Sequence, residues 1–91
     1  VFPSSVEEVV LRLDCVEDCC VVGKPDEQRG ERVAIFVTLK DGTDRSLAAE
    51  QIRALLVREC EPYVAHAEIN VIAVMPRTML GKIDFKQLRY T

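Results

Sequence analysis

The segment "RVAIFVTLK", residues 32–40, constrains the fold of this chain more than any other stretch. It is a nearly continuous apolar run from Val33 to Leu39, and Asp41-Gly42 follows it as a turn signal. A strand that is apolar on both faces must be covered on both faces. The sequence therefore predicts a sheet in which this strand is central.

Two further runs predict the remaining strands. Residues 16–23, "VEDCCVVG", are short and rich in β-branched side chains, and residues 67–75, "AEINVIAVM", alternate at first and then become fully apolar. Between the first two strands, residues 24–31 ("KPDEQRGE") predict a connection in which Asp26 and Gly30 supply the turn chemistry.

Helical spacing marks the segments on either side of these strands. The first helix opens at "PSSVEEVV", where Ser4 or Ser5 begins an S-x-x-E capping box. A second helix is predicted over residues 46–60, with Ser46 as its N-cap.

A short final helix is predicted to start near Asp84 and to bury Phe85 and Leu88. The element order is then helix, strand, strand, helix, strand, helix. This order predicts an α+β fold, in which a small mixed sheet is covered by about three helices.

The length of 91 residues fits one small domain, residues 1–91. No apolar run approaches the roughly 18 residues that a membrane span needs, and no signal-peptide pattern opens the chain. We therefore expect a protein without a transmembrane segment, located in the cytoplasm. Because the chain begins at Val1 and enters a helix almost at once, we also expect it to be a piece of something longer.

The net charge is -3, but four bases and one acid occupy the last residues, from Arg77 onward. Affinity for nucleic acid depends on neutralising many phosphates at once, so the acidic remainder argues against a nucleic-acid partner. A local basic patch suits a single phosphate-bearing ligand better.

The chain holds four cysteines and one histidine, His66. Cys19 and Cys20 are adjacent and Cys60 is isolated, which does not match the paired spacing of structural zinc ligands. We therefore expect no metal site, and small buried thiols in a reducing compartment.

No nucleotide-binding glycine loop or Ser/His/Asp set can be assembled, and the most informative segment is the loop from Pro76 to Lys82. Most loop lysines are solvated and have no specific role. Here Gly81 permits backbone angles closed to other residues, and Ile83 follows as an apolar anchor. Such a loop would present its lysine to an anionic transition state.

The segment "PRTMLGKID" resembles the C-terminal signature P-x-T-x-x-G-K-[IV] of the AMP-forming acyl-CoA synthetase, peptide-synthetase adenylation domain and luciferase superfamily. "VFPSSVEEVV", "VVGKPDEQRGERVAIFVTLKDG" and "CEPYVAHAEINVIAVMPRT" look like its preceding segments, in the right order. The resemblance spans nearly the whole chain.

The resemblance implies the C-terminal lid domain of a two-domain, adenylate-forming ligase. The large N-terminal domain, absent from this chain, would bind ATP, Mg²⁺ and a carboxylic acid, and no ligand is expected on this fragment alone. Lys82 would be the catalytic residue of acyl-adenylate formation. In a second orientation the lid would expose another face while coenzyme A, or the pantetheine of a carrier protein, captures the acyl group.

Gly81, Thr78 and Arg77 are expected to support the loop, with a solvated surface charge as the alternative for Arg77. The leading hypothesis is that the chain is the lid of an acyl-CoA synthetase and that this lid is inactive in isolation. Two alternatives stay open: the lid of a peptide-synthetase adenylation domain, and a stand-alone interaction module that has lost the reaction.

Overall fold

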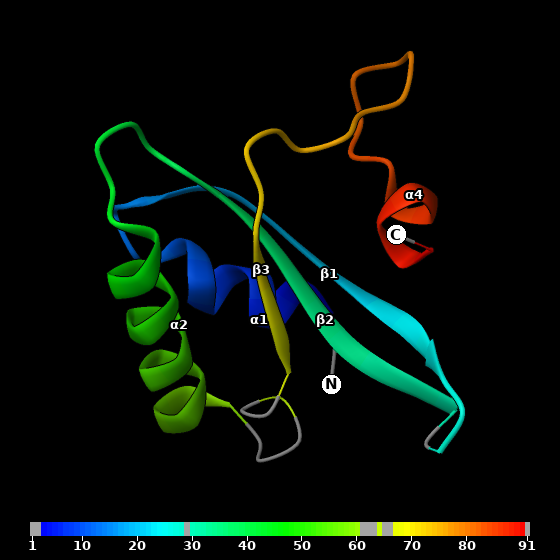
Figure 1. The fold of residues 1–91 in the computed structure, drawn as a ribbon, viewed down its shortest axis with the longest axis horizontal. Coiled ribbons are helices and arrows are strands. Elements are labelled where there is room, and N and C mark those ends of the chain that lie inside the picture. The colour runs from blue at the N-terminus through cyan, green and yellow to red at the C-terminus, as the bar shows by residue number, and fades with distance from the viewer. Residues whose placement is uncertain (1–2, 29, 61–63, 65–66, 91) are drawn as a thin grey trace.

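The computed structural model describes residues 3–28, 30–60, 64 and 67–90. The helices and strands follow one another in the expected order along the chain (Figure 1). Their bounds are α1 (Pro3–Leu11), β1 (Val16–Asp26), β2 (Gly30–Leu39), α2 (Arg45–Glu59), β3 (Glu68–Val71) and α4 (Phe85–Arg89).

The three strands form one mixed sheet with the order β1-β2-β3. β1 and β2 pair antiparallel as a hairpin, whereas β2 and β3 pair parallel, because α2 carries the chain back between them. The central place of β2, which its apolar run predicts, is confirmed, and so is the α+β class with three helices in the described part of the chain.

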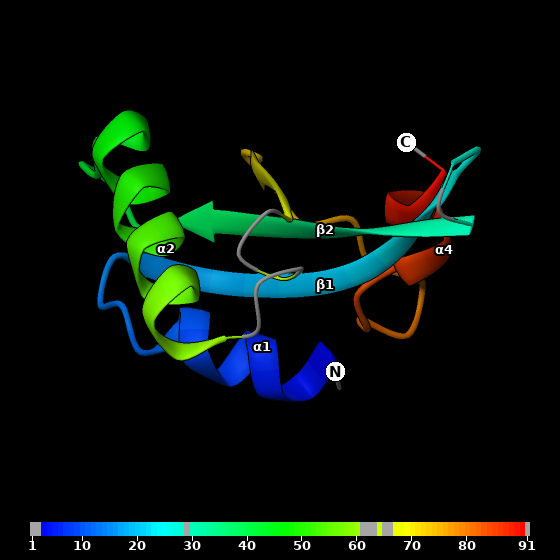
Figure 2. The same cartoon turned by 90° about the horizontal axis from the view of Figure 1, so that it is seen from below.

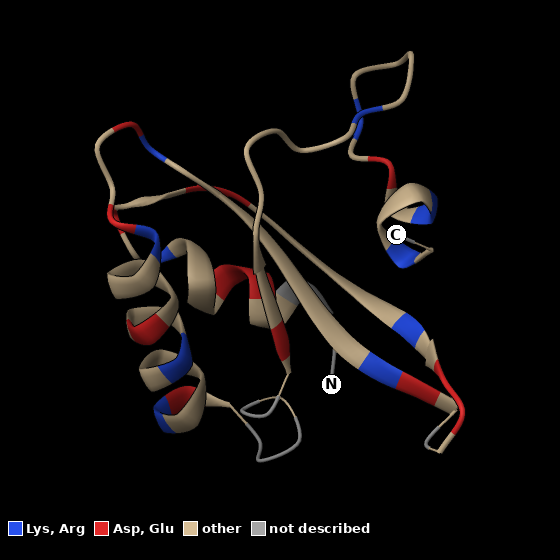
Figure 3. Cartoon of the chain, in the orientation of Figure 1, with Lys and Arg blue, Asp and Glu red and all other residues tan. Residues whose placement is uncertain are grey.

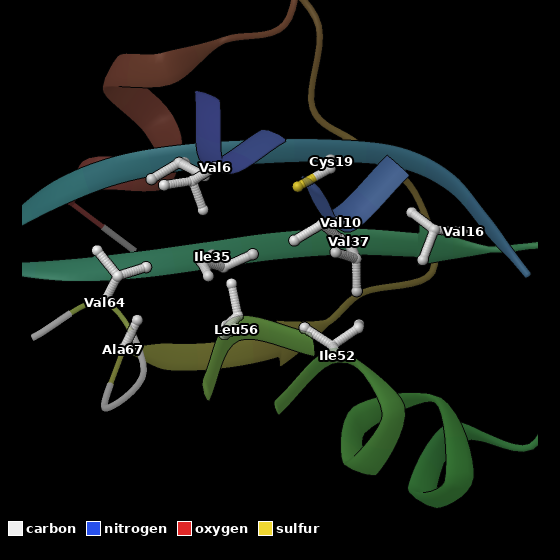
Figure 4. Close-up of a cluster of buried hydrophobic side chains, with 11 residues drawn as sticks. Val6, Val10, Val16, Cys19, Ile35, Val37, Ile52, Leu56, Val64 and Ala67 are labelled. Atoms are coloured by element: carbon white, nitrogen blue, oxygen red, sulfur yellow. The ribbon is translucent and has the colours of Figure 1, made fainter. Parts of the chain in front are cut away.

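One face of the sheet packs against α1 and α2. Side chains from both helices and from β1 and β2 point toward one another in this cluster (Figure 4), and α1 runs beneath β1 (Figure 2). Ile35, Val37, Ile52 and Leu56 are completely buried here. Burial of this kind supplies most of the free energy that favours folding.

The other face carries a second, smaller cluster beneath α4 and the loop that precedes it. Cys20, Val22, Ala34, Phe36, Met75 and Leu88 are its buried members, with Ile72 and Ile83 packed against them. Both ends of the loop that contains Lys82 are therefore anchored on this face, at Met75 and Ile83.

The β1–β2 hairpin is longer than the sequence suggests. Pairing continues to Asp26 opposite Gly30, so residues 24–26 and 30–31 belong to the strands and not to the predicted connection. Gly30 has a φ of 81°, and the Asp26 carboxylate accepts a hydrogen bond from the amide of Gln28 at 3.2 Å. The expected turn chemistry at Asp26 and Gly30 is confirmed.

Two predicted helix starts are wrong. α1 already includes Pro3, so Ser4 and Ser5 lie inside its first turn and not at the N-cap. α2 is capped by Asp44, whose carboxylate accepts from the Leu47 amide at 3.1 Å, whereas Ser46 lies within the helix. A carboxylate that reaches the third amide ahead satisfies a donor that the helix leaves free.

The C-terminal part departs from the prediction at two points. β3 ends at Val71 and not at residue 75, and Val74 is 78% exposed. α4 is capped by Asp84 and buries Leu88 as predicted, but Phe85 is 55% exposed and the prediction that it is buried is wrong. All four cysteines are free thiols, and Cys19 and Cys20 are buried as expected, but Cys15 and Cys60 are partly exposed, so the expectation of buried thiols is wrong for these two. His66 lies outside the described residues.

Candidate functional site

The loop between β3 and α4 is a small hairpin that projects from the sheet, drawn in orange at the top right of Figure 1. Arg77 and Ile83 face each other in an isolated antiparallel bridge. The Thr78 amide donates to the Lys82 carbonyl at 2.7 Å, and the Gly81 amide donates to the Thr78 carbonyl at 2.9 Å. We refer to residues 77–83 as the lysine hairpin.

The turn of the lysine hairpin requires a glycine. Gly81 has a φ of 84°, whereas no other kind of residue has a positive φ in the described parts of the chain. The turn residues Met79 and Leu80 therefore keep negative φ, as in the common three-residue hairpin loop that ends in a left-handed glycine. Both hydrogen bonds that close the hairpin involve the backbone of Thr78, once as donor and once as acceptor.

Lys82 lies on the returning arm of the hairpin and is exposed. Its ammonium group has no hydrogen bond or ion pair with the part of the chain that the structure describes. Basic residues lie at the base of the hairpin, and its tip is uncharged (Figure 3). The tip residues Met79 and Leu80 are 105% and 86% exposed. The backbone around Lys82 is thus ordered while its charge is available to a ligand.

The Arg77 side chain makes one contact within the lysine hairpin and one with the sheet. Its Nη1 donates to the Gly81 carbonyl at 3.1 Å, and its Nη2 lies 3.4 Å from Oδ2 of Asp18 on β1. These contacts place Arg77 against the hairpin turn and against β1, and the expectation that Arg77 supports the loop stays a prediction. Asp18 could not be identified from the sequence, because it lies far from Arg77 along the chain and contacts it only in the folded structure.

A shallow groove of about 450 Å³ lies between β1 and α4. Its lining comes from β1, from α4 and from the residue that follows α4: Val21, Val22, Gly23, Phe85, Lys86, Arg89 and Tyr90. Among the described residues no group of three or more His, Cys, Asp or Glu is placed to hold a metal ion. The lysine hairpin thus presents the cation of Lys82, and α4 presents basic side chains beside exposed apolar ones.

Comparison with known proteins gives a consistent result. A family model described as "AMP-binding enzyme C-terminal domain" matches residues 5–82. The medium/long-chain-fatty-acid–CoA ligase FadD8 of Mycobacterium tuberculosis is 36% identical over 94 residues, which is 98% of this chain and 16% of the relative.

Two of the solved structures that share the fold illustrate the likeness. An acyl-CoA synthetase of Brucella canis aligns with a TM-score of 0.81 and 33% identity, over 97% of this chain and 16% of that one. The amide bond synthetase McbA of Marinactinospora thermotolerans aligns with a TM-score of 0.85 and 30% identity, over 99% of this chain and 18% of that one. The chain therefore spans less than a fifth of the length of each of these proteins.

Proposed function

This chain belongs to the family of AMP-binding enzyme C-terminal domains, and on that premise we propose that it is the lid of an AMP-forming acyl-CoA synthetase in which Lys82 serves the adenylation step. One observation carries the role of Lys82: its ammonium group extends without a partner among the described residues from a hairpin whose backbone is fixed. An available cation on an ordered support is what a developing anion requires.

In the first half-reaction a carboxylate oxygen attacks the α-phosphorus of ATP. The new oxygen–phosphorus bond gives the acyl-adenylate, and the bond to the bridging oxygen of pyrophosphate breaks. Two anions are brought together, so a positioned ammonium that contacts both carboxylate and phosphate oxygens lowers the barrier. Lys82 supplies this charge, while ATP, its Mg²⁺ and the acid are held by the large N-terminal domain.

In the second half-reaction a thiol attacks the acyl carbon and AMP leaves. The lid turns another face toward the active site for this step, and Lys82 withdraws. We prefer coenzyme A as the acceptor, because FadD8 and the Brucella protein are described as a CoA ligase and an acyl-CoA synthetase. The pantetheine of a carrier protein and an amine are the alternatives, the latter because McbA is described as an amide bond synthetase.

The location also stays a proposal. No helix in the described residues is long and apolar enough to cross a membrane. We propose a cytoplasmic enzyme, since ATP and coenzyme A are consumed there.

The test uses the full-length ligase with Lys82→Ala. ATP–pyrophosphate exchange reports adenylation, and thioester formation from preformed acyl-adenylate reports the second step. We expect exchange to fall about a hundredfold, as when one preorganised charge stabiliser is removed, while thioester formation persists.

Lys40→Ala is the matched control, because Lys40 is an exposed lysine in the loop after β2. It should leave both rates unchanged. Equal exchange rates in the Lys82 and Lys40 variants would contradict the proposal and would favour the interaction module. Offering coenzyme A, a carrier protein or an amine to the wild-type adenylate identifies the acceptor.

A further inference from the structure

Arg77 bridges two parts of the molecule that are far apart in the sequence. One terminal nitrogen donates to the Gly81 carbonyl at 3.1 Å, and the other lies 3.4 Å from the Asp18 carboxylate. The guanidinium group is planar, and its nitrogens have a fixed relative geometry. The two contacts together therefore fix the turn of the lysine hairpin relative to β1.

Asp18 is itself held in place by β2. The hydroxyl of Thr38 donates to Oδ2 of Asp18 at 3.3 Å, and the Asp18 amide donates to Oγ1 of Thr38 at 3.1 Å. Thr38 is only 6% exposed. The carboxylate that receives Arg77 is thus anchored on the central strand of the sheet, and is not a freely rotating surface group.

A β-bulge aims Asp18 toward the lysine hairpin. Val16 pairs with Leu39 and Asp18 pairs with Thr38, so Glu17 is an extra residue in β1. Val16 belongs to the cluster under α1 and α2, whereas Cys20 and Val22 belong to the cluster on the opposite face. Since side chains alternate along a strand, Asp18 shares the face of Cys20. Without the bulge it would share the face of Val16 and point away from the hairpin.

We propose that Asp18 and Arg77 form a strap that positions the lysine hairpin, and with it Lys82, for the adenylation step. This inference rests on the function proposed above. The ion pair is partly exposed, with the side chains 45% and 37% accessible, and such pairs add little to global stability. Its consequence lies in geometry: a displacement of about 1 Å of a positioned group can slow a reaction about a hundredfold. Arg77 and Asp18 are positioning residues, and neither needs to touch the substrate.

The test compares Arg77→Ala, Asp18→Ala and the double variant in the full-length ligase. Each single variant should lower ATP–pyrophosphate exchange about tenfold at saturating ATP and acid, because the hairpin samples more positions. The double variant should be no slower than the slower single variant, since both substitutions break one contact. Thioester formation from preformed acyl-adenylate should be unchanged, which also reports that the variants are folded.

A second measurement does not depend on activity. The amides of Thr78 and Gly81 close the lysine hairpin, so their hydrogen exchange in the full-length protein should accelerate in both single variants. Arg12→Ala is the matched control, because Arg12, in the turn that follows α1, makes a comparable exposed ion pair with Glu59 at the end of α2, at 3.0 Å. It should change neither the adenylation rate nor these amides.

The outcomes separate the two proposals. If Lys82→Ala abolishes ATP–pyrophosphate exchange while Arg77→Ala and Asp18→Ala behave like Arg12→Ala, the positioning role of the strap is contradicted and the proposed function stands. If Lys82→Ala leaves exchange intact, the proposed function fails, and with it any role of the strap in adenylation.

Discussion

Lys24 on β1 donates from its Nζ to Oε2 of Glu68 on β3 at 3.2 Å, so this ion pair reaches across the central strand. Arg32 on β2 lies 3.4 Å from the other oxygen of Glu68, and Asn70 donates to Oε2 at 2.9 Å. These partners stabilise the charged carboxylate: the hydrogen bond from Asn70 and then the interaction with Lys24 lower the pKa of Glu68 below its ordinary value of 4.5. Glu68 thus links all three strands.

Glu68→Gln should make the 91-residue chain less stable in a pH-dependent way. A carboxylate with a lowered folded pKa contributes stability above its unfolded pKa and loses that contribution as the pH falls through the folded pKa. We expect a loss of about 1 kcal/mol or less at pH 7, because the side chain is 35% exposed and solvent screens it. The loss should shrink as the pH falls below 4.5.

Urea unfolding of both proteins across this pH range measures the difference, and Glu50→Gln, on an exposed position of α2, is the control. A destabilisation by Glu68→Gln that stays constant from neutral to acid pH would show that the charge of Glu68 is not its cause.

Gly81→Ala should slow adenylation through the backbone alone. An added Cβ meets no atom within 4 Å, but the φ of 84° is strained for any side chain. The left-handed conformation costs about 1–2 kcal/mol for an L-residue, so the turn should shift and exchange of ATP and pyrophosphate should fall about tenfold in the full-length ligase.

Gly42→Ala is a close control, because Gly42 has the same φ of 84° and equally open surroundings, in the loop between β2 and α2. It should bring the same strain and no loss of adenylation. Asparagine tolerates this conformation better, so Gly81→Asn should retain more activity than Gly81→Ala. Equal adenylation rates in Gly81→Ala and Gly42→Ala would contradict a special role for the hairpin turn.

Cys19 and Cys20 should resist thiol reagents while the domain is folded. Burial, and then the nearby charge of Glu7, raise the pKa of Cys19 to about 12 and that of Cys20 to about 11. Only the thiolate reacts, and it is scarce at pH 8. In a variant with Cys15→Ser and Cys60→Ser, Ellman's reagent should label nothing until denaturant is added. Rapid labelling of this native variant would show that the β1 thiols are accessible.

The sequence predicts those elements whose signals lie close together in the chain. The apolar run of β2 specifies a central strand, and the Asp84 cap and Leu88 place α4, because each signal lies within a few residues. The end of β3 could not be predicted in this way. Residues 72–75 are as apolar as a buried strand, yet β3 pairs only at Glu68–Val71, and the chain then leaves the sheet toward the lysine hairpin.

In the candidate site, too, residues that form a local pattern could be predicted and contacts between distant residues could not. Gly81 and Lys82 can be found from a local pattern, since a glycine turn and its neighbour are consecutive in the chain. The contact of Arg77 with Asp18 cannot be found in this way, because it depends on the bulge at Glu17 and on the position that the fold gives the hairpin relative to β1. Phe85 illustrates the converse error: its apolar side chain suggests burial, but it remains exposed beside the groove.

The most direct test of the central claim removes the charge of Lys82 and little else. Nε-acetyllysine at position 82 of the full-length ligase keeps the stem of the side chain and the backbone of the hairpin, but it cannot stabilise an anion. With acetylation verified by mass spectrometry, we predict that ATP–pyrophosphate exchange falls about a hundredfold, that thioester formation from preformed acyl-adenylate continues, and that enzymatic deacetylation restores exchange. Unchanged exchange at full acetylation would contradict the claim that Lys82 acts in adenylation.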